Sequence, residues 1–145
     1  MGEMGLLSAD ELLHLPLRLR GIRLGHAVDL LLAPSTPRVV GFVIVCGDDT
    51  PRFLPFAAAR PCKDAIEVAS ALVLLEDVDF YRGRARSLRS LRGGTVRRDG
   101  RPAGELRDLV LSEDGAVCAV VVARDGREER LDIEGTTLSS EQAAA

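Results

Sequence analysis

The side chains best suited to chemistry are few in this chain. Three cysteines and two histidines are present, namely Cys46, Cys62, Cys118, His14 and His26. Cys62 follows a proline in an expected loop, but neither a nucleophile elbow nor a cysteine-protease signature surrounds it. The other two cysteines lie on apolar strands and are interpreted as small core residues. We therefore expect no catalytic residues and predict that the chain is not an enzyme.

The same residues do not have the spacing of a metal-ligand set. The pair Asp48-Asp49 offers carboxylate oxygens in a turn, but no further oxygen ligands follow at EF-hand spacing. The pair Gly93-Gly94 is followed by residues typical of a strand, so neither a Walker loop nor a dinucleotide fingerprint is present. We expect no metal and no cofactor.

One electrostatic feature does rise above the background of a chain whose net charge is −3. The segment from Arg82 to Arg101 contains eight arginines and one acidic residue, Asp99, and so carries a charge of +7. Its first five arginines are the candidate partner-binding residues: Arg82, Arg84, Arg86, Arg89 and Arg92.

Three interpretations of this segment stay open. It could be a solvated linker whose arginines pair with Glu76, Asp77 and Asp79, a contact surface for an acidic protein, or a grip for RNA phosphates. The RNA interpretation has less support, because the chain is only 3% aromatic and has few rings on which bases could stack.

The composition describes a globular chain of 145 residues with an aliphatic core, because 46% of its residues are hydrophobic and few are aromatic. An odd cysteine count without a signal peptide favours the reducing cytoplasm. The longest apolar runs, Val39–Cys46 and Ala71–Leu75, fall far short of the roughly 20 residues that span a bilayer, so no membrane insertion is expected.

The positions of these residues follow an internal repeat. A shift of 79 places residues 8–32 on residues 87–111 with eight identities in 25 positions. The identical pairs are Ser8/Ser87, Leu12/Leu91, Arg18/Arg97, Gly21/Gly100, Gly25/Gly104, Asp29/Asp108, Leu30/Leu109 and Leu32/Leu111. A shift of 77 then places residues 40–45 on residues 117–122, and Leu54 on Leu131.

Each half is predicted to consist of short strands. Residues 8–11 have capping-box spacing and predict a helical turn. In the first half we expect strands over 17–19, 26–32, 38–46 (central) and 52–56, and over 65–75 either one long strand or two strands joined by a bend. In the second half we expect strands over 95–98, 105–111, 117–123 and 128–133. Asp-Gly pairs at 99–100 and 125–126 predict type I′ hairpin turns.

The first half has five features in order along the chain. These are a turn glycine, a second glycine four residues on, an aspartate four residues later, a β-branched strand and a closing Leu-Pro-aromatic sequence. The residues are Gly21, Gly25, Asp29, Val39–Val45 and Leu54-Pro55-Phe56. In these features the first half is similar to the PRC-barrel domain. The second half resembles a diverged copy, with Gly100, Gly104, Asp108 and Val117–Val122. The glycines are expected to allow close strand approach, and each mid-strand aspartate to accept hydrogen bonds from a turn or an arginine.

The resemblance implies two small barrels, with short helical turns, that act as docking modules. We expect an N-terminal tail over 1–7, a first half over 8–77, a linker over 78–90, a second half over 91–138 and a flexible tail over 139–145. Such relatives are the photosynthetic reaction-centre H subunit, whose membrane helix is absent here, and a ribosome maturation factor, whose N-terminal barrel is of another type.

The predicted function is a cytoplasmic adaptor that binds another protein or a copy of itself. Phe42, Phe80 and Tyr81 are candidates for an apolar contact patch, or for the seam between the halves. The alternative is an RNA- or ribosome-associated factor that uses the arginine-rich segment.

Overall fold

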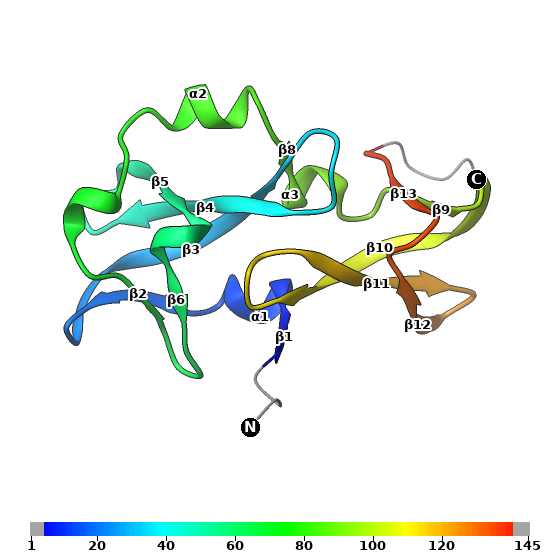
Figure 1. The fold of residues 1–145 in the computed structure, drawn as a ribbon, viewed down its shortest axis with the longest axis horizontal. Coiled ribbons are helices and arrows are strands. Elements are labelled where there is room, and N and C mark those ends of the chain that lie inside the picture. The colour runs from blue at the N-terminus through cyan, green and yellow to red at the C-terminus, as the bar shows by residue number, and fades with distance from the viewer. Residues whose placement is uncertain (1–4, 141–145) are drawn as a thin grey trace.

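A computed structural model of the chain describes residues 5–140, which form a mainly β protein with two sheets (Figure 1). The strands of the first sheet are β2 (Pro16–Leu19), β3 (Ile22–Leu32), β4 (Val39–Cys46), β5 (Pro51–Pro55), β6 (Arg60–Pro61), β7 (Ile66–Glu67) and β8 (Arg86–Ser87). The strands of the second sheet are β1 (Leu6–Ser8), β9 (Thr95–Arg98), β10 (Arg101–Ser112), β11 (Val117–Arg124), β12 (Arg127–Asp132) and β13 (Thr136–Leu138). The helical segments are α1 (Ala9–Leu12), η2 (Phe56–Ala58), η3 (Ala71–Val73), α2 (Val78–Arg82) and α3 (Leu88–Leu91).

The order of the first sheet is β5-β4-β3-β2-β7-β6, and that of the second is β12-β11-β10-β9-β13. Strand β4 therefore lies between two neighbours, which confirms the central strand predicted over residues 38–46. No closed barrel is detected in residues 5–140, so the pair of barrels stays a prediction.

The hairpin turns follow the local sequence. Both residues of Asp99-Gly100 (φ 52° and 81°) and of Asp125-Gly126 (φ 53° and 78°) adopt positive φ, which confirms the predicted type I′ conformation. Arg20-Gly21 does the same (φ 51° and 83°), so β3 begins at Ile22, directly after this turn and earlier than predicted. The predicted helical turn also forms, because the Ser8 side chain accepts the Glu11 backbone N–H at 3.2 Å.

The segment at the start of each half pairs with a strand of the other half. Strand β1 pairs with β10 of the second half, and β8 pairs with β3 of the first. Residues 6–8 therefore form a strand where a tail was expected. Residues 1–4 of the expected N-terminal tail and residues 141–145 of the expected C-terminal tail lie outside the described part of the chain. The expected linker over 78–90 instead contains α2, β8 and most of α3, with Leu88 fully buried.

The strand pairing corrects the alignment of the two halves. Strand β3 pairs Leu30 with Phe42, and β10 pairs Leu109 with Val120. The shift between β4 and β11 is therefore 78, and the shift of 77 predicted for this strand is wrong. A slip of one residue exchanges the two faces of a strand, and the low diversity of the β-branched runs conceals such a slip in the sequence.

One long strand over residues 65–75 is wrong, and the alternative of two strands joined by a bend holds only for residues 66–67 and for the bridge at Leu75. Only β7 forms there, and the next residues turn into η3, because the Ser70 side chain accepts the Leu72 backbone N–H at 3.1 Å. Such a local hydrogen bond competes with sheet pairing. Leu75 returns to the sheet through a bridge to Phe53.

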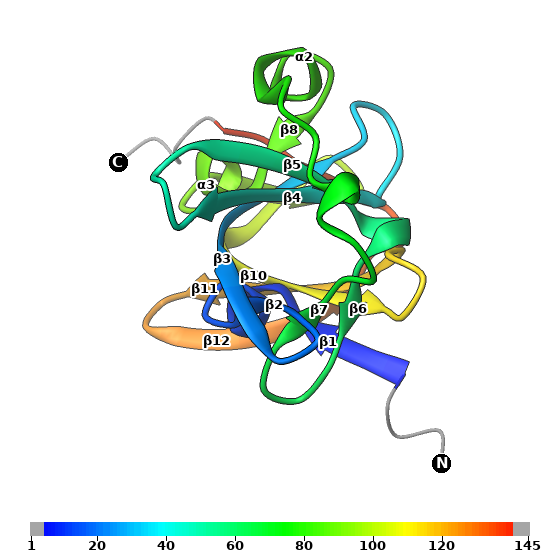
Figure 2. The ribbon, with the colours of Figure 1, turned by 90° about the vertical axis from the view of Figure 1, so that its left-hand side faces the viewer.

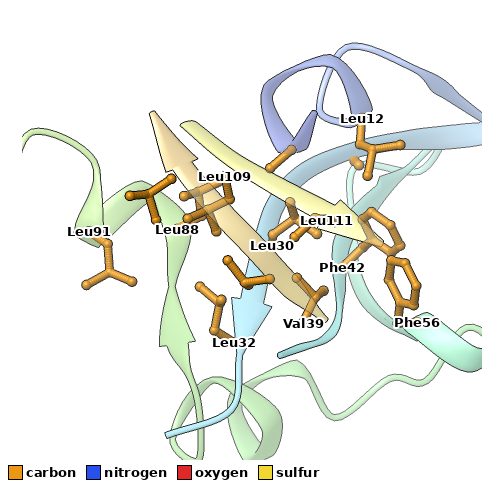
Figure 3. Packing of buried hydrophobic residues seen from close by; sticks show 14 of the residues in the cluster. Leu12, Leu30, Leu32, Val39, Phe42, Phe56, Leu88, Leu91, Leu109 and Leu111 are labelled. Carbon is orange, nitrogen blue, oxygen red and sulfur yellow. The ribbon is translucent and has the colours of Figure 1, made fainter. Parts of the chain in front are cut away.

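The two halves share one hydrophobic core. In Figure 2, β4 and β5 lie on one side of the molecule and β11 and β12 on the other. Buried side chains from both halves form a single cluster between them, in which Leu30 and Phe42 join Leu109 and Leu111 (Figure 3). The sheets also meet where Val39 N–H donates to the Gly115 carbonyl at 2.8 Å. The main core is therefore shared by the two sheets.

Candidate functional site

Helix α2 lies against the outer face of the first sheet, opposite the shared core. Leu31, Val43 and Phe53 of this sheet form a second buried cluster with Val78 of the helix. The helix begins at a cap, because the Asp77 side chain accepts the Phe80 backbone N–H at 3.4 Å. Burial of Val78 and capping by Asp77 together hold this short helix on the sheet.

A stack of aromatic rings leads from this outer cluster to the surface. The Phe53 and Tyr81 rings are parallel, with centroids 4.0 Å apart and planes at 7°, and Phe80 meets Tyr81 edge to face at 5.1 Å. The Arg84 guanidinium lies 3.8 Å from the centre of the Phe80 ring and also donates to the Phe80 carbonyl at 3.1 Å. Phe80 nevertheless stays 45% exposed. We call Phe80, Tyr81 and Arg84 the α2 patch.

The three aromatic residues predicted for a contact patch lie in different environments. Phe42 is fully buried and stacks on Phe56 at 5.7 Å, so it belongs to the shared core rather than to a surface patch. Tyr81 is partly buried over the first sheet, and Phe80 is the aromatic side chain at the surface.

The five candidate arginines do not share one environment. Arg84 packs on Phe80, and Arg82 pairs with Asp79 at a long 3.8 Å. Arg86 is half-buried and donates through Nε to the Ala33 carbonyl at 3.3 Å. A fourth, Arg92, contacts the Asp10 carboxylate, whereas Arg89 is exposed. Of the acidic residues expected to pair with this segment, Asp79 does so and Asp77 serves as a helix cap.

Two of these arginines line one cavity and a third lines another. Arg82 and Arg86 border a cavity of about 680 Å³ next to β8. Arg92 borders a cavity of about 410 Å³, where Asp10, Asp108 and Glu128 offset its charge. The arginine-rich segment of the sequence is therefore divided between places of different charge.

The paired aspartates explain how the halves hold one another. Asp29 accepts the Ser87 hydroxyl and the Arg89 backbone N–H at 3.1 Å, both from the opening segment of the second half. Asp108 accepts the Ser8 hydroxyl at 2.6 Å and the Asp10 backbone N–H at 2.9 Å. Each aspartate thus accepts hydrogen bonds from a helix start of the other half, in the same pattern.

The glycines of the motif lie where backbones approach closely or turn. A Cβ on Gly25 would lie 2.2 Å from the Val45 carbonyl oxygen, and one on Gly104, whose φ is 145°, would lie 2.9 Å from that of Ala123. Gly21 and Gly100 are the second residues of hairpin turns. These four residues therefore serve the backbone.

The cysteines and histidines are not assembled into a reactive group among the described residues. The Cys62 thiol donates to the Arg60 carbonyl at 3.5 Å, and burial raises the pKa of the Cys46 thiol, which disfavours the thiolate. The exposed His14 side chain, two residues after the end of α1, lies 3.9 Å from the Asp10 carboxylate. Within residues 5–140, no group of three metal-binding side chains gathers.

Sequence reasoning missed helix α2 and the stack of rings beneath it. The signal was present, because Asp77 precedes Phe80 by the three residues typical of an N-cap. The charged residues around it concealed that Val78 and Tyr81 share a face. Ser87 was found as a repeat identity, but its contact with Asp29 crosses 58 residues of chain and left no local mark.

No model of a protein family matches this chain, and no curated protein matches it. In the described part of the chain, no helix has both the length and the apolar character needed to span a bilayer.

Proposed function

We propose that this chain is a non-catalytic adaptor that binds another protein, with the α2 patch as the main contact. The observation that carries the proposal is the ring of Phe80, which is 45% exposed while Tyr81 and Arg84 hold it from two sides. Aromatic residues and arginine are the types enriched at the centres of protein interfaces. A ring that is already fixed loses little conformational entropy on binding.

The same proposal includes a duplicated PRC-barrel-like ancestry. Its support is the recurrence of the Asp29 contacts at Asp108, together with register shifts at corresponding places in β3 and β10. These shifts fall after Ala27 and Leu31 in one strand, and after Leu106 and Val110 in the other.

A protein partner fits better than RNA. Arg82, Arg84, Arg86 and Arg92 each contact groups of the chain itself, and Arg92 lies among carboxylates. Single-stranded nucleic acid needs a charged groove along its backbone and free ring faces for its bases. Here the Arg84 guanidinium already covers a face of Phe80.

Affinity capture from a lysate of the source organism tests this function. The wild-type chain is compared with the double variant Phe80→Ala/Arg84→Ala and with Leu72→Ala, a control at an apolar side chain that is 88% exposed. We expect a defined protein with the wild type and the control at low and high salt, with or without ribonuclease, and its loss with the double variant. Capture of RNA or ribosomal proteins at low salt alone, abolished by ribonuclease, would contradict the proposal and favour the RNA alternative.

A further inference from the structure

A groove runs between β8 of the first sheet and β13 of the second. It consists of two cavities, of about 680 Å³ and about 510 Å³, that share Arg86 and Leu138 as lining residues. The strands that border it belong to different sheets, and Figure 1 shows both of them on the side of the molecule that carries α2. Cavities of this size accept peptide side chains or small ligands.

Strand β13 presents a free edge, because β9 is its sole partner strand in residues 5–140. Thr136 pairs with Arg98, and the adjacent Asp99 N–H donates to the Gly135 carbonyl at 2.8 Å. This pattern places Thr136 and Leu138 at non-hydrogen-bonded positions of the ladder. The N–H and C=O groups of Leu138 therefore point away from β9, where they are available to a further strand.

Two arginines, Arg82 and Arg86, and two acidic residues, Asp29 and Glu134, line the groove. Glu134 belongs to the cavity of about 510 Å³, which Arg82 does not line. Arg86 binds the Ala33 carbonyl through Nε alone, and the Arg82 side chain, 47% exposed, has a weak ion pair with a carboxylate that is 96% exposed. Asp29 already accepts hydrogen bonds from Ser87 and Arg89. The guanidinium groups can therefore donate hydrogen bonds to carboxylates of a bound chain.

The groove also has apolar lining residues, of which Ile133 and Leu138 are half-buried and Leu31, Leu91 and Val117 are almost fully buried. Leu31 and Leu91 line one cavity, and Val117 and Ile133 line the other. An extended chain places alternate side chains on opposite faces, so a bound strand can direct apolar side chains to these residues and acidic ones to the arginines.

We propose that this groove binds an extended segment of the partner protein, in which apolar and acidic residues alternate, as an added strand on β13. The proposal rests on the adaptor function and identifies the chemistry of its partner. Carboxylates of the segment contact Arg82 and Arg86, and its backbone pairs with Leu138.

The test uses a fluorescently labelled peptide in which valine alternates with glutamate, and a matched peptide in which glutamine replaces glutamate. Fluorescence anisotropy with the full chain should show that the glutamate peptide binds at least about tenfold more tightly, because each charge-assisted hydrogen bond contributes to its affinity. Arg82→Gln/Arg86→Gln should remove this difference, whereas Arg97→Gln, at an exposed arginine of β9, should preserve it. Equal affinity for the two peptides would overturn the proposal.

Hydrogen exchange tests the added strand in the wild-type chain, so it does not depend on a variant that folds. The peptide should slow exchange of the Leu138 amide, whereas the Thr137 amide, which faces β9, should change little. Unchanged exchange at Leu138 would refute strand addition. A dimer that Arg82→Gln/Arg86→Gln disrupts, with no peptide binding, would assign the groove to a second copy of the chain and also overturn the proposal.

The two proposals can fail separately. Capture of a partner that Phe80→Ala/Arg84→Ala abolishes, together with no peptide binding, would refute the groove and leave the adaptor function intact. Peptide binding without any captured protein would support the groove and contradict the wider function.

Discussion

At the scale of single residues, Asp29 shows how a polar side chain is accommodated within a strand. Asp29 is only 7% exposed. Its carboxylate accepts hydrogen bonds from the Ser87 hydroxyl, the Arg89 backbone N–H and, at 2.9 Å, the Leu30 backbone N–H. Aspartate is unfavourable in most strands. Here its carboxylate oxygens accept hydrogen bonds from groups at the start of a helix of the other half, which otherwise have no partner within that helix. The residue is thus a connector between halves.

We expect Asp29→Ala to lower the free energy of unfolding by about 3 kcal/mol, because it leaves the Ser87 hydroxyl and the Arg89 N–H without an acceptor in a partly buried place. Asp29→Asn keeps one acceptor oxygen and should cost less. Urea denaturation measures both, with Asp64→Ala at an exposed bend as the control. A loss below about 1 kcal/mol in Asp29→Ala would show that the contacts contribute little.

At the scale of elements, the long strands β3 and β10 bend at register shifts and pass close to their neighbours. The tightest approach is at Gly25, where an added Cβ would lie 2.2 Å from the Val45 carbonyl oxygen and 2.9 Å from the Cys46 Cα. Both neighbours are backbone atoms, which cannot rotate away as a side chain can. Glycine is therefore required here by the spacing of two strands rather than by a turn.

Gly25→Ala should lower the free energy of unfolding by about 2 kcal/mol or more, because the strands must separate to admit the methyl group. Gly104→Ala should also destabilise, through its φ of 145° as well as its close contact. Thermal and urea denaturation provide the measurement. Gly47→Ala is the matched control, since a Cβ at that position meets nothing within 4 Å; an equal loss in the control would contradict the argument.

At the scale of the whole molecule, the exchange of β1 and β8 makes the two halves interdependent. Each is short enough that burial alone gives marginal stability. The shared cluster around Leu30 and Leu109 and the exchanged strands mean that neither half completes its sheet alone.

We therefore predict that fragments 1–76 and 77–145 fold together and not separately. Each fragment alone should lack a cooperative thermal transition, whereas the mixture should form a one-to-one complex with a circular dichroism spectrum close to that of the intact chain. Calorimetry and light scattering measure the two properties. Cooperative unfolding of either isolated fragment near the Tm of the intact chain would show that the halves are independent.

The sequence by itself determined much of the local structure. The Asp-Gly turns, the helical turn at Ser8, the strand over 117–123 and the mainly β class follow from preferences that act over a few residues. The motif glycines and aspartates were also recognisable from the sequence, because two copies at the same spacing marked them.

The tertiary structure decided what depends on distant partners. Ser8 contacts Asp108 across 100 residues, and neither this exchange nor the shift of 78 between β4 and β11 leaves a trace in neighbouring residues. The α2 patch likewise exists because the outer face of the first sheet buries Val78 and Tyr81, although the surrounding sequence is polar. Burial and register arise from the packing of whole strands, whereas turn and cap preferences are local, and this difference separates what could be predicted from what could not.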